Sequence, residues 1–220
     1  MRSSLAVTAS LAAAPLLTLG EELERLKDAG VEGIHLDVED GVFVPAMNLG
    51  LRLVEEIARW GKLPIDVHLM VENPEGVLEL LPDLPLRRVS VHLESTRYPR
   101  RVLRKVAERG YRPGLAINPA TPPPALRYLS PHIEHLLVLS TEPEAGSAPH
   151  LPGVVAQLGP VVSEAHELGL QVIVDGAVDG ENADSIAAQG ADGAVVGRAL
   201  FSSPDIHATV RRIAQGEPNA

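Results

Sequence analysis

The chain has 220 residues, of which 45% are hydrophobic and 22% are charged, and its formal net charge is −10. These values are typical of an ordinary globular protein, and the acidic balance argues against a polyanion-binding surface, so nucleic acid is not expected as a partner. Cys is absent, which excludes disulfides, a thiolate metal site and a cysteine nucleophile, so any metal site must use His and carboxylate ligands.

The N-terminal segment has some features of a secretory signal, because Arg2 is followed by a mostly apolar run that ends at Leu19. Thr8, Ser10 and Pro15 interrupt that run, and a helical pattern follows at once. We therefore expect a first strand at Ser4–Thr8 and a cytoplasmic protein without a membrane partner.

Short apolar runs with polar ends alternate with stretches of helical periodicity along the whole chain. Strands are predicted at Leu5–Thr8, Gly33–Asp37, Pro64–His68, Arg88–His92, Gly114–Asn118, His135–Ser140, Gln171–Asp175 and Gly193–Gly197. Helices are predicted at Leu19–Ala29, Leu51–Trp60, Pro74–Leu81, Arg100–Arg109, Pro123–Leu129, Val154–Leu168, Glu181–Gln189 and Pro204–Ala214.

Eight βα units predict a parallel eight-stranded sheet closed into a single (β/α)₈ barrel, a TIM barrel, over residues 1–220. The alternative is an open doubly wound sheet, but no G-x-G-x-x-G motif follows the first strand.

Polar residues gather at the C-terminal ends of these strands, where a (β/α)₈ barrel carries its chemistry. They are Ser10, His35, Asp37, Asp66, His68, His92, Glu94, Asn118, Ser140 and Asp175. The N-terminal strand ends show mostly Gly, Pro, Val and Arg, and we expect no comparable polar cluster there.

Four of the rim residues form a set that suits a divalent metal ion: His35, Asp37, His68 and Asp175. Imidazole and carboxylate together fit Zn²⁺, Fe²⁺, Mn²⁺ or Co²⁺, and the sequence does not choose among them. A closed structural zinc site is one interpretation. The other is acid/base catalysis by Asp37 and Asp175, which lie on strands expected on roughly opposite sides of the barrel mouth. With a metal on a neighbouring oxygen, two opposed carboxylates are what epimerisation next to a carbonyl requires.

The chain also resembles the ribulose-phosphate 3-epimerase family in five motifs that occur in order. These are H-L-D-V-E-D-G-V-F-V-P at 35–45, D-V-H-L-M-V-E-N-P at 66–74, H-L-E at 92–94, G-L-A-I-N-P-A-T-P at 114–122 and V-D-G at 174–176. The resemblance implies that His35, Asp37, His68 and Asp175 bind the metal and that Asp37 and Asp175 transfer protons. It also implies a homo-oligomer.

Substrate-binding residues are likewise implied by the resemblance. His68, Ser10 and Met70 fall near the reacting centre, although an N-capping Ser and a core Met are the structural alternatives. Backbone N–H groups at Gly176, Ala177, Gly197 and Arg198 correspond to the usual phosphate cradle of this fold.

The chain departs from the family pattern mainly around the phosphate end of the substrate. Glu142–Ala148 replaces a glycine-rich covering loop and places Glu142 and Glu144 near the expected dianion. Ala177 replaces a Gly, and the added methyl group can hinder the close approach of a phosphate to the backbone. Arg198 replaces a Ser and can grip phosphate, pair with Glu142 or Glu144, or point to solvent.

A further departure lies inside the best-matched motif, where Glu39 replaces a Met. There it can add a ligand, tune a pKa or face away into the turn.

We expect a metal-dependent 3-epimerase acting on a small sugar phosphate, D-ribulose 5-phosphate or a relative. The alternatives are an epimerase or isomerase for another sugar, such as an unphosphorylated one, and a sugar-phosphate-binding barrel or metal-assisted lyase.

Overall fold

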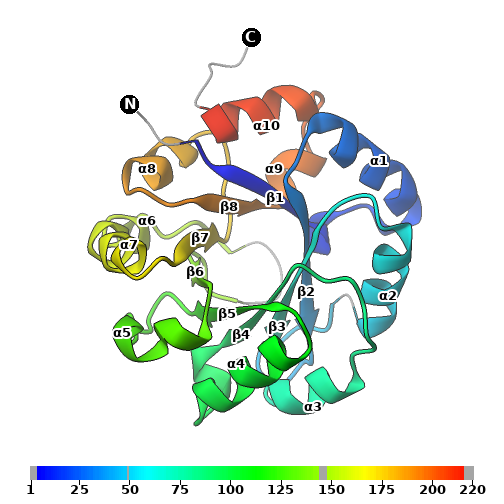
Figure 1. Cartoon of the computed structure of the whole chain (residues 1–220). Helices are drawn as coiled ribbons and strands as arrows, with labels where there is room; N and C mark the ends of the chain where they lie inside the picture. The colour runs from blue at the N-terminus through cyan, green and yellow to red at the C-terminus, as the bar shows by residue number, and fades with distance from the viewer. Residues whose placement is uncertain (1–3, 49, 144–147, 216–220) are drawn as a thin grey trace.

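The structure is a computed structural model that describes residues 4–48, 50–143 and 148–215. Eight parallel strands pair in chain order, and the eighth pairs with the first, so the sheet closes into a barrel with helices outside it (Figure 1). This confirms the predicted (β/α)₈ barrel. In the described part of the chain, no helix is long and apolar enough to cross a membrane.

The strands are β1 Ala6–Ser10, β2 Gly33–Glu39, β3 Ile65–Met70, β4 Arg88–His92, β5 Arg112–Ile117, β6 His135–Leu139, β7 Gln171–Asp175 and β8 Gly193–Val196. The α-helices are α1 Leu19–Ala29, α2 Leu51–Trp60, α3 Pro74–Leu80, α4 Pro99–Glu108, α5 Leu126–Leu129, α6 Pro152–Val155, α7 Leu158–Glu167, α8 Ala183–Ala188, α9 Arg198–Phe201 and α10 Ile206–Gln215. Short 3₁₀ helices are η1 Leu11–Ala13, η2 Leu16–Thr18, η3 Leu93–Ser95 and η4 Ser130–His132.

Each strand has one set of side chains under the helices and one set inside the barrel, because successive side chains alternate between faces. Leu36, Val67 and Val89 belong to the fully buried outer core, which packs against the helices. The barrel interior holds a separate apolar cluster of Ala116, Leu137, Leu139, Ile173 and Val195. Both faces are thus covered, which explains why these strands read as continuous apolar runs.

Two predicted helices differ from the structure, and proline explains both differences. The helix predicted at Val154–Leu168 is two helices, α6 and α7. Pro160 has no N–H to donate, and its ring clashes with a helical turn that precedes it, so a continuous helix through this position is disfavoured. The first turn of a helix tolerates proline, and Pro160 lies in the first turn of α7, which begins at Leu158. The helix predicted at Pro123–Leu129 is reduced to α5, since a residue that precedes proline is disfavoured in helical conformation.

The N-terminal half of the barrel interior contains a polar cluster, which the sequence analysis did not expect. Asp66 lies near the start of β3 rather than at the C-terminal rim, and it accepts hydrogen bonds from Arg87 at 2.7 and 2.6 Å. Arg88 donates to Asp66 at 3.3 Å and to Gln171 of β7 at 2.8 Å. The prediction that placed Asp66 with the rim residues was therefore wrong, because strand register is not visible in sequence.

His135 of β6 belongs to the same buried polar layer. Its Nε2 lies 2.8 Å from the hydroxyl of Ser90. A Cβ on Gly114 would lie 2.0 Å from that Nε2, so only glycine at 114 leaves room for the ring. Burial, and then the charge of Arg88, lower the pKa of His135 to about 3.

This pKa predicts a pH dependence of stability. Below pH 6.5 the unfolded chain binds a proton on His135 that the folded protein does not accept until about pH 3. The stabilisation by neutral His135 is therefore complete above 6.5 and falls as the pH decreases through that window. In urea denaturation of metal-free protein, the stability difference between wild type and His135→Gln should narrow by about 1.4 kcal/mol per pH unit below 6.5. An unchanged difference near pH 4 and near pH 7 would contradict this.

Candidate active site

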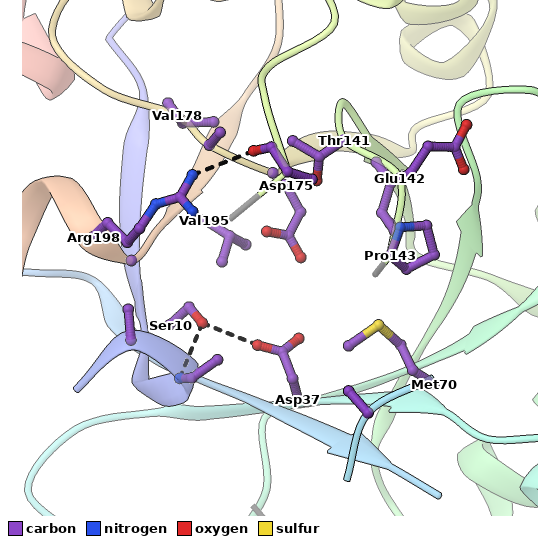
Figure 2. A pocket seen from close by; sticks show the side chains of 18 of the residues that line it. Ser10, Asp37, Met70, Thr141, Glu142, Pro143, Asp175, Val178, Val195 and Arg198 are labelled. Atoms are coloured by element: carbon purple, nitrogen blue, oxygen red, sulfur yellow. Dashed lines mark hydrogen bonds between the residues drawn. The ribbon is translucent and has the colours of Figure 1, made fainter. Parts of the chain in front are cut away.

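A cavity of about 750 Å³ opens at the C-terminal ends of the strands. It is lined by most of the predicted site residues, namely Ser10, Asp37, Met70, Asp175, Gly176, Ala177, Gly197 and Arg198. Figure 2 shows Asp37 and Asp175 facing each other across this space, Asp37 from β2 and Asp175 from β7. His35 and His68 are buried beneath the carboxylates, with 3% and 0% of their surface exposed.

The four predicted metal ligands come together. One ligand atom from each of His35, Asp37, His68 and Asp175 lies within 4.8 Å of every other. The Nε2 atom of His35 is 3.2 Å from Asp37 Oδ1 and 3.5 Å from Asp175 Oδ2. The Nδ1 atom of His68 is 3.1 Å from Asp37 Oδ1 and 3.7 Å from Asp175 Oδ2. Alternation explains the convergence on β2, because residues 35 and 37 project from one face of the strand.

The geometry around His35 fits a divalent ion. Its Nε2 is buried and makes no hydrogen bond, although it lies 3.2 Å from a carboxylate oxygen. A buried polar atom normally has a partner, and an ion held between this nitrogen and the two carboxylates would provide one. Two imidazoles and two carboxylates are ligands that Zn²⁺, Fe²⁺, Mn²⁺ and Co²⁺ accept.

The two carboxylates differ in their electrostatic surroundings. Burial would raise the pKa of Asp37, but the nearby His35 and His68 hold the pKa well below its usual range. Burial raises the pKa of Asp175 well above its usual value, and the charge of Asp37 adds to the increase. Burial lowers the pKa of His35, but Asp37 and Asp175 outweigh it and raise the pKa to about 9.

Ser10 combines the two roles considered for it. Its hydroxyl donates to Asp37 Oδ2 at 2.9 Å, and its oxygen accepts the N–H of Ala12 at 3.3 Å as the N-cap of η1. Ser10 therefore fixes the carboxylate of Asp37 as well as the first turn after β1. Both bonds are drawn in Figure 2.

Met70 and Glu39 are paired across β3 and β2 and both line the cavity. The Glu39 side chain thus faces the site and not the turn. Its Oε2 atom is buried without a hydrogen-bond partner, and burial together with the charge of Asp37 raises the pKa of Glu39 to about 7.

The loop after β7 has a constrained backbone. Gly176 has φ 112°, and a Cβ there would lie 2.5 Å from the Oγ1 of Thr141, so this position requires glycine. Ala177 has φ 48°, in the left-handed region that costs a residue with a side chain about 1 kcal/mol. Ser140 supports the loop by donating to the carbonyls of Asp175 and Gly176.

Arg198 begins α9, a helix that the sequence analysis did not predict. Its Nη2 donates to the carbonyl of Ala148 at 3.3 Å. Among the described residues that line the cavity, Arg198 has the one Lys or Arg side chain. The described residues contain no ion pair between Arg198 and Glu142, and Glu144 lies outside the described residues.

The sequence alone does not connect His92 and Glu94 to the metal-ligand set. In the structure, His92 Nε2 lies 2.9 Å from His68 Nε2, and His92 Nδ1 lies 3.0 Å from Glu94 Oε2. The sequence pattern that points to them is the spacing of His92 and Glu94, two residues apart where β4 ends. Their partners depend on side-chain rotamers, which a sequence does not show.

Comparison with known proteins gives a consistent result. The model of the ribulose-phosphate 3 epimerase family matches residues 6–201. Among curated relatives, ribulose-phosphate 3-epimerase from Synechocystis is 32% identical over 209 residues, covering 93% of this chain and 91% of that protein. The enzyme of the same name from Bacillus subtilis is 30% identical over 202 residues, covering 90% and 93%.

Solved structures show the same architecture at low identity. The tryptophan synthase α subunit of Legionella pneumophila has a TM-score of 0.64 at 14% identity, covering 97% of this chain and 92% of that chain. The Pyrococcus furiosus α subunit has a TM-score of 0.65 at 15% identity, covering 97% and 99%. These similarities concern the fold.

Proposed function

Because this chain belongs to the ribulose-phosphate 3-epimerase family, whose members are carbohydrate epimerases, we propose that it inverts C3 of a ketose phosphate. The proposed reaction interconverts D-ribulose 5-phosphate and D-xylulose 5-phosphate or a close relative. The observation that supports it most is the placement of Asp37 and Asp175 on opposite walls of one cavity, both beside His35 and His68.

Proton transfer is assigned to the two carboxylates. Asp37, kept ionised by its neighbours, removes the C3 proton from one epimer, and Asp175, whose raised pKa favours the protonated form, supplies a proton to the opposite face. The same groups act in the opposite order in the reverse direction. Ser10 holds Asp37 in position through its 2.9 Å hydrogen bond.

His35, His68, Asp37 and Asp175 would hold one divalent ion, which supplies electrostatic stabilisation of the negative charge that develops on the substrate oxygens next to C3. Met70 borders the reacting region and excludes water from it. His35 and His68 are buried, and all four residues of the ligand set belong to strands of the barrel.

The phosphate is assigned to the ends of β7 and β8. Gly176, Ala177, Gly197 and Arg198 line that side of the cavity, and backbone N–H groups after these two strands commonly bind phosphate in this fold. Arg198 adds a guanidinium that suits a dianion. We assign Arg198 the role of a phosphate contact: its guanidinium gives up the hydrogen bond to the Ala148 carbonyl and donates to the phosphate instead.

Replacing Arg198 by Ala should raise KM for D-ribulose 5-phosphate about 10- to 100-fold, because a hydrogen bond to a charged group contributes about 1.5–3 kcal/mol. The value of kcat should change much less, since C3 is two carbons away from the carbon that bears the phosphate. Steady-state kinetics with phosphorylated and unphosphorylated ketoses measures this. Arg104→Ala, on the exposed face of α4, serves as the matched control. A KM unchanged by Arg198→Ala would contradict the assignment.

A second candidate substrate is an unphosphorylated sugar. The carboxylates of Glu39, Glu142 and Asp179 also line the cavity and disfavour a dianion. The same kinetic panel separates the two candidates, because equal turnover of the phosphorylated and unphosphorylated sugar in the wild-type protein would favour the second.

A further inference from the structure

A chain of hydrogen-bonding groups connects the metal-ligand cluster to Glu94 of η3, which directly follows β4. It runs from Asp37 Oδ1 to His68 Nδ1 at 3.1 Å, from His68 Nε2 to His92 Nε2 at 2.9 Å, and from His92 Nδ1 to Glu94 Oε2 at 3.0 Å. Both rings are fully buried, with 0% exposure, so water does not compete for their nitrogens. The four groups therefore depend on each other for hydrogen bonds.

The two imidazole rings carry fewer N–H hydrogens than the three contacts between Asp37, His68, His92 and Glu94 require. Three contacts separate the two carboxylates, but two neutral imidazoles carry only two N–H groups. With both rings neutral, one of the three contacts therefore lacks a hydrogen, and a bound cation would satisfy that contact. Which contact this is depends on the direction in which the two N–H groups point.

Glu94 determines that direction. Its Oε1 accepts the N–H of Asn118 at 2.7 Å and the hydroxyl of Thr121, so its Oε2 is left to accept from His92. Burial would raise the pKa of Glu94, but hydrogen bonds from His92 and Thr121 lower it to about 2, so the group is an acceptor only. His92 thus donates from Nδ1, and its Nε2 accepts from His68 Nε2.

We propose that Glu94, acting through His92, is a positioning residue that leaves the lone pair of His68 Nδ1 directed at the metal. The inference rests on the metal-dependent part of the proposed function. It assigns the contact without a hydrogen to the gap between His68 Nδ1 and Asp37 Oδ1, which belongs to the candidate metal site. Without this orientation His68 would present an N–H to the ion and could not bind it.

Glu94→Gln provides a test because an amide of the same shape reverses the chain. Asn118 and Thr121 keep an oxygen at the Oε1 position, so the amide NH₂ faces His92 Nδ1. His92 then donates from Nε2 to His68, and His68 donates from Nδ1 to Asp37. The amide has supplied the third hydrogen, and all three contacts are satisfied without a cation.

The experiment is a Zn²⁺ titration of the full chain against a chromophoric chelator, with melting curves of the metal-free proteins. Glu94→Gln should bind Zn²⁺ at least tenfold more weakly than wild type, and more weakly than Glu94→Ala, in which water can donate or accept. Metal-free Glu94→Gln should melt no lower than metal-free wild type. Nitrogen-15 spectra of its labelled histidines should show His68 protonated at Nδ1. Glu75→Gln, which removes a carboxylate paired with Lys105 and Arg101 on the outer surface, should bind Zn²⁺ like wild type.

A purely structural role predicts the opposite order, with Ala more harmful than Gln and with both metal-free variants less stable. That order, or Zn²⁺ affinity within twofold of wild type in Glu94→Gln, would overturn the inference and leave the proposed function intact. A wild-type protein that binds none of Zn²⁺, Co²⁺ and Mn²⁺ would instead overturn the metal site on which both depend.

Discussion

Asp37→Asn and Asp175→Asn should each reduce interconversion of D-ribulose 5-phosphate and D-xylulose 5-phosphate by about 10³-fold or more. Positioned proton transfer typically contributes 10²- to 10⁴-fold, and the proposed mechanism uses both carboxylates in each epimerisation. Asn keeps the shape of the side chain and one oxygen, but it cannot accept the substrate proton. The two carboxylates face each other across the cavity, so we expect each to serve one face of C3.

The two variants should differ in isotope exchange. In D₂O, each should still exchange the C3 proton of the one epimer that its remaining carboxylate can reach, and the reactive epimer should be opposite in the two variants. Metal content measured for each protein separates a lost ligand from a lost base. Asp83→Asn, a fully exposed carboxylate paired with Arg109, should behave as wild type. Interconversion within tenfold of wild type in either variant would contradict the two-carboxylate assignment.

Removal of the metal should have an effect of similar size. Stripping the protein with a chelator should lower turnover on the order of 10³-fold, since Lewis-acid stabilisation of developing charge contributes several kcal/mol. It should also lower Tm. Metal at 1,000 times its Kd stabilises a folded protein by about 4.1 kcal/mol, which corresponds to about 8–16 °C for a chain of this size. Melting curves and activity after re-addition of Zn²⁺, Fe²⁺, Mn²⁺ or Co²⁺ measure both effects.

Two histidine variants make the metal experiment specific. His68→Gln replaces a buried member of the cluster and should abolish the metal-dependent change in Tm. His132→Gln replaces a partly buried histidine that lies outside the metal-ligand cluster and contacts Arg100, and this variant should retain the metal-dependent change in Tm. Equal Tm changes in both variants would show that the ion binds elsewhere.

The barrel could be predicted because its signal is repeated eight times, and one misjudged boundary does not change the number of units. The boundaries of α1 and α2 match the prediction. The break between α6 and α7 was missed because the periodicity continues through it, whereas the constraint comes from the single residue Pro160. Helix α9 was missed because its four residues are too short to show a period.

The convergence of the four candidate metal ligands could be predicted because alternation fixes which residues of one strand share a face, and the barrel brings the strand ends together. Asp66 shows the limit of this reasoning. It precedes His68 by two residues and projects from the same face, but it lies lower in the barrel and pairs with Arg87 and Arg88. The height of a side chain along the barrel axis depends on the register between strands. The hydrogen-bonded series from His68 through His92 to Glu94 depends on side-chain rotamers. Neither can be read from the sequence.

We propose above all that this protein exchanges the C3 proton of a phosphorylated ketose, and inverts the configuration at C3, with a divalent ion bound. The most direct measurement is a proton NMR time course of D-ribulose 5-phosphate in D₂O with the metal-loaded wild-type protein. We expect loss of the C3 proton signal together with the appearance of C3-deuterated D-xylulose 5-phosphate, and neither change with the metal-free protein. A substrate that keeps its C3 proton and its configuration with the metal-loaded protein would contradict the claim.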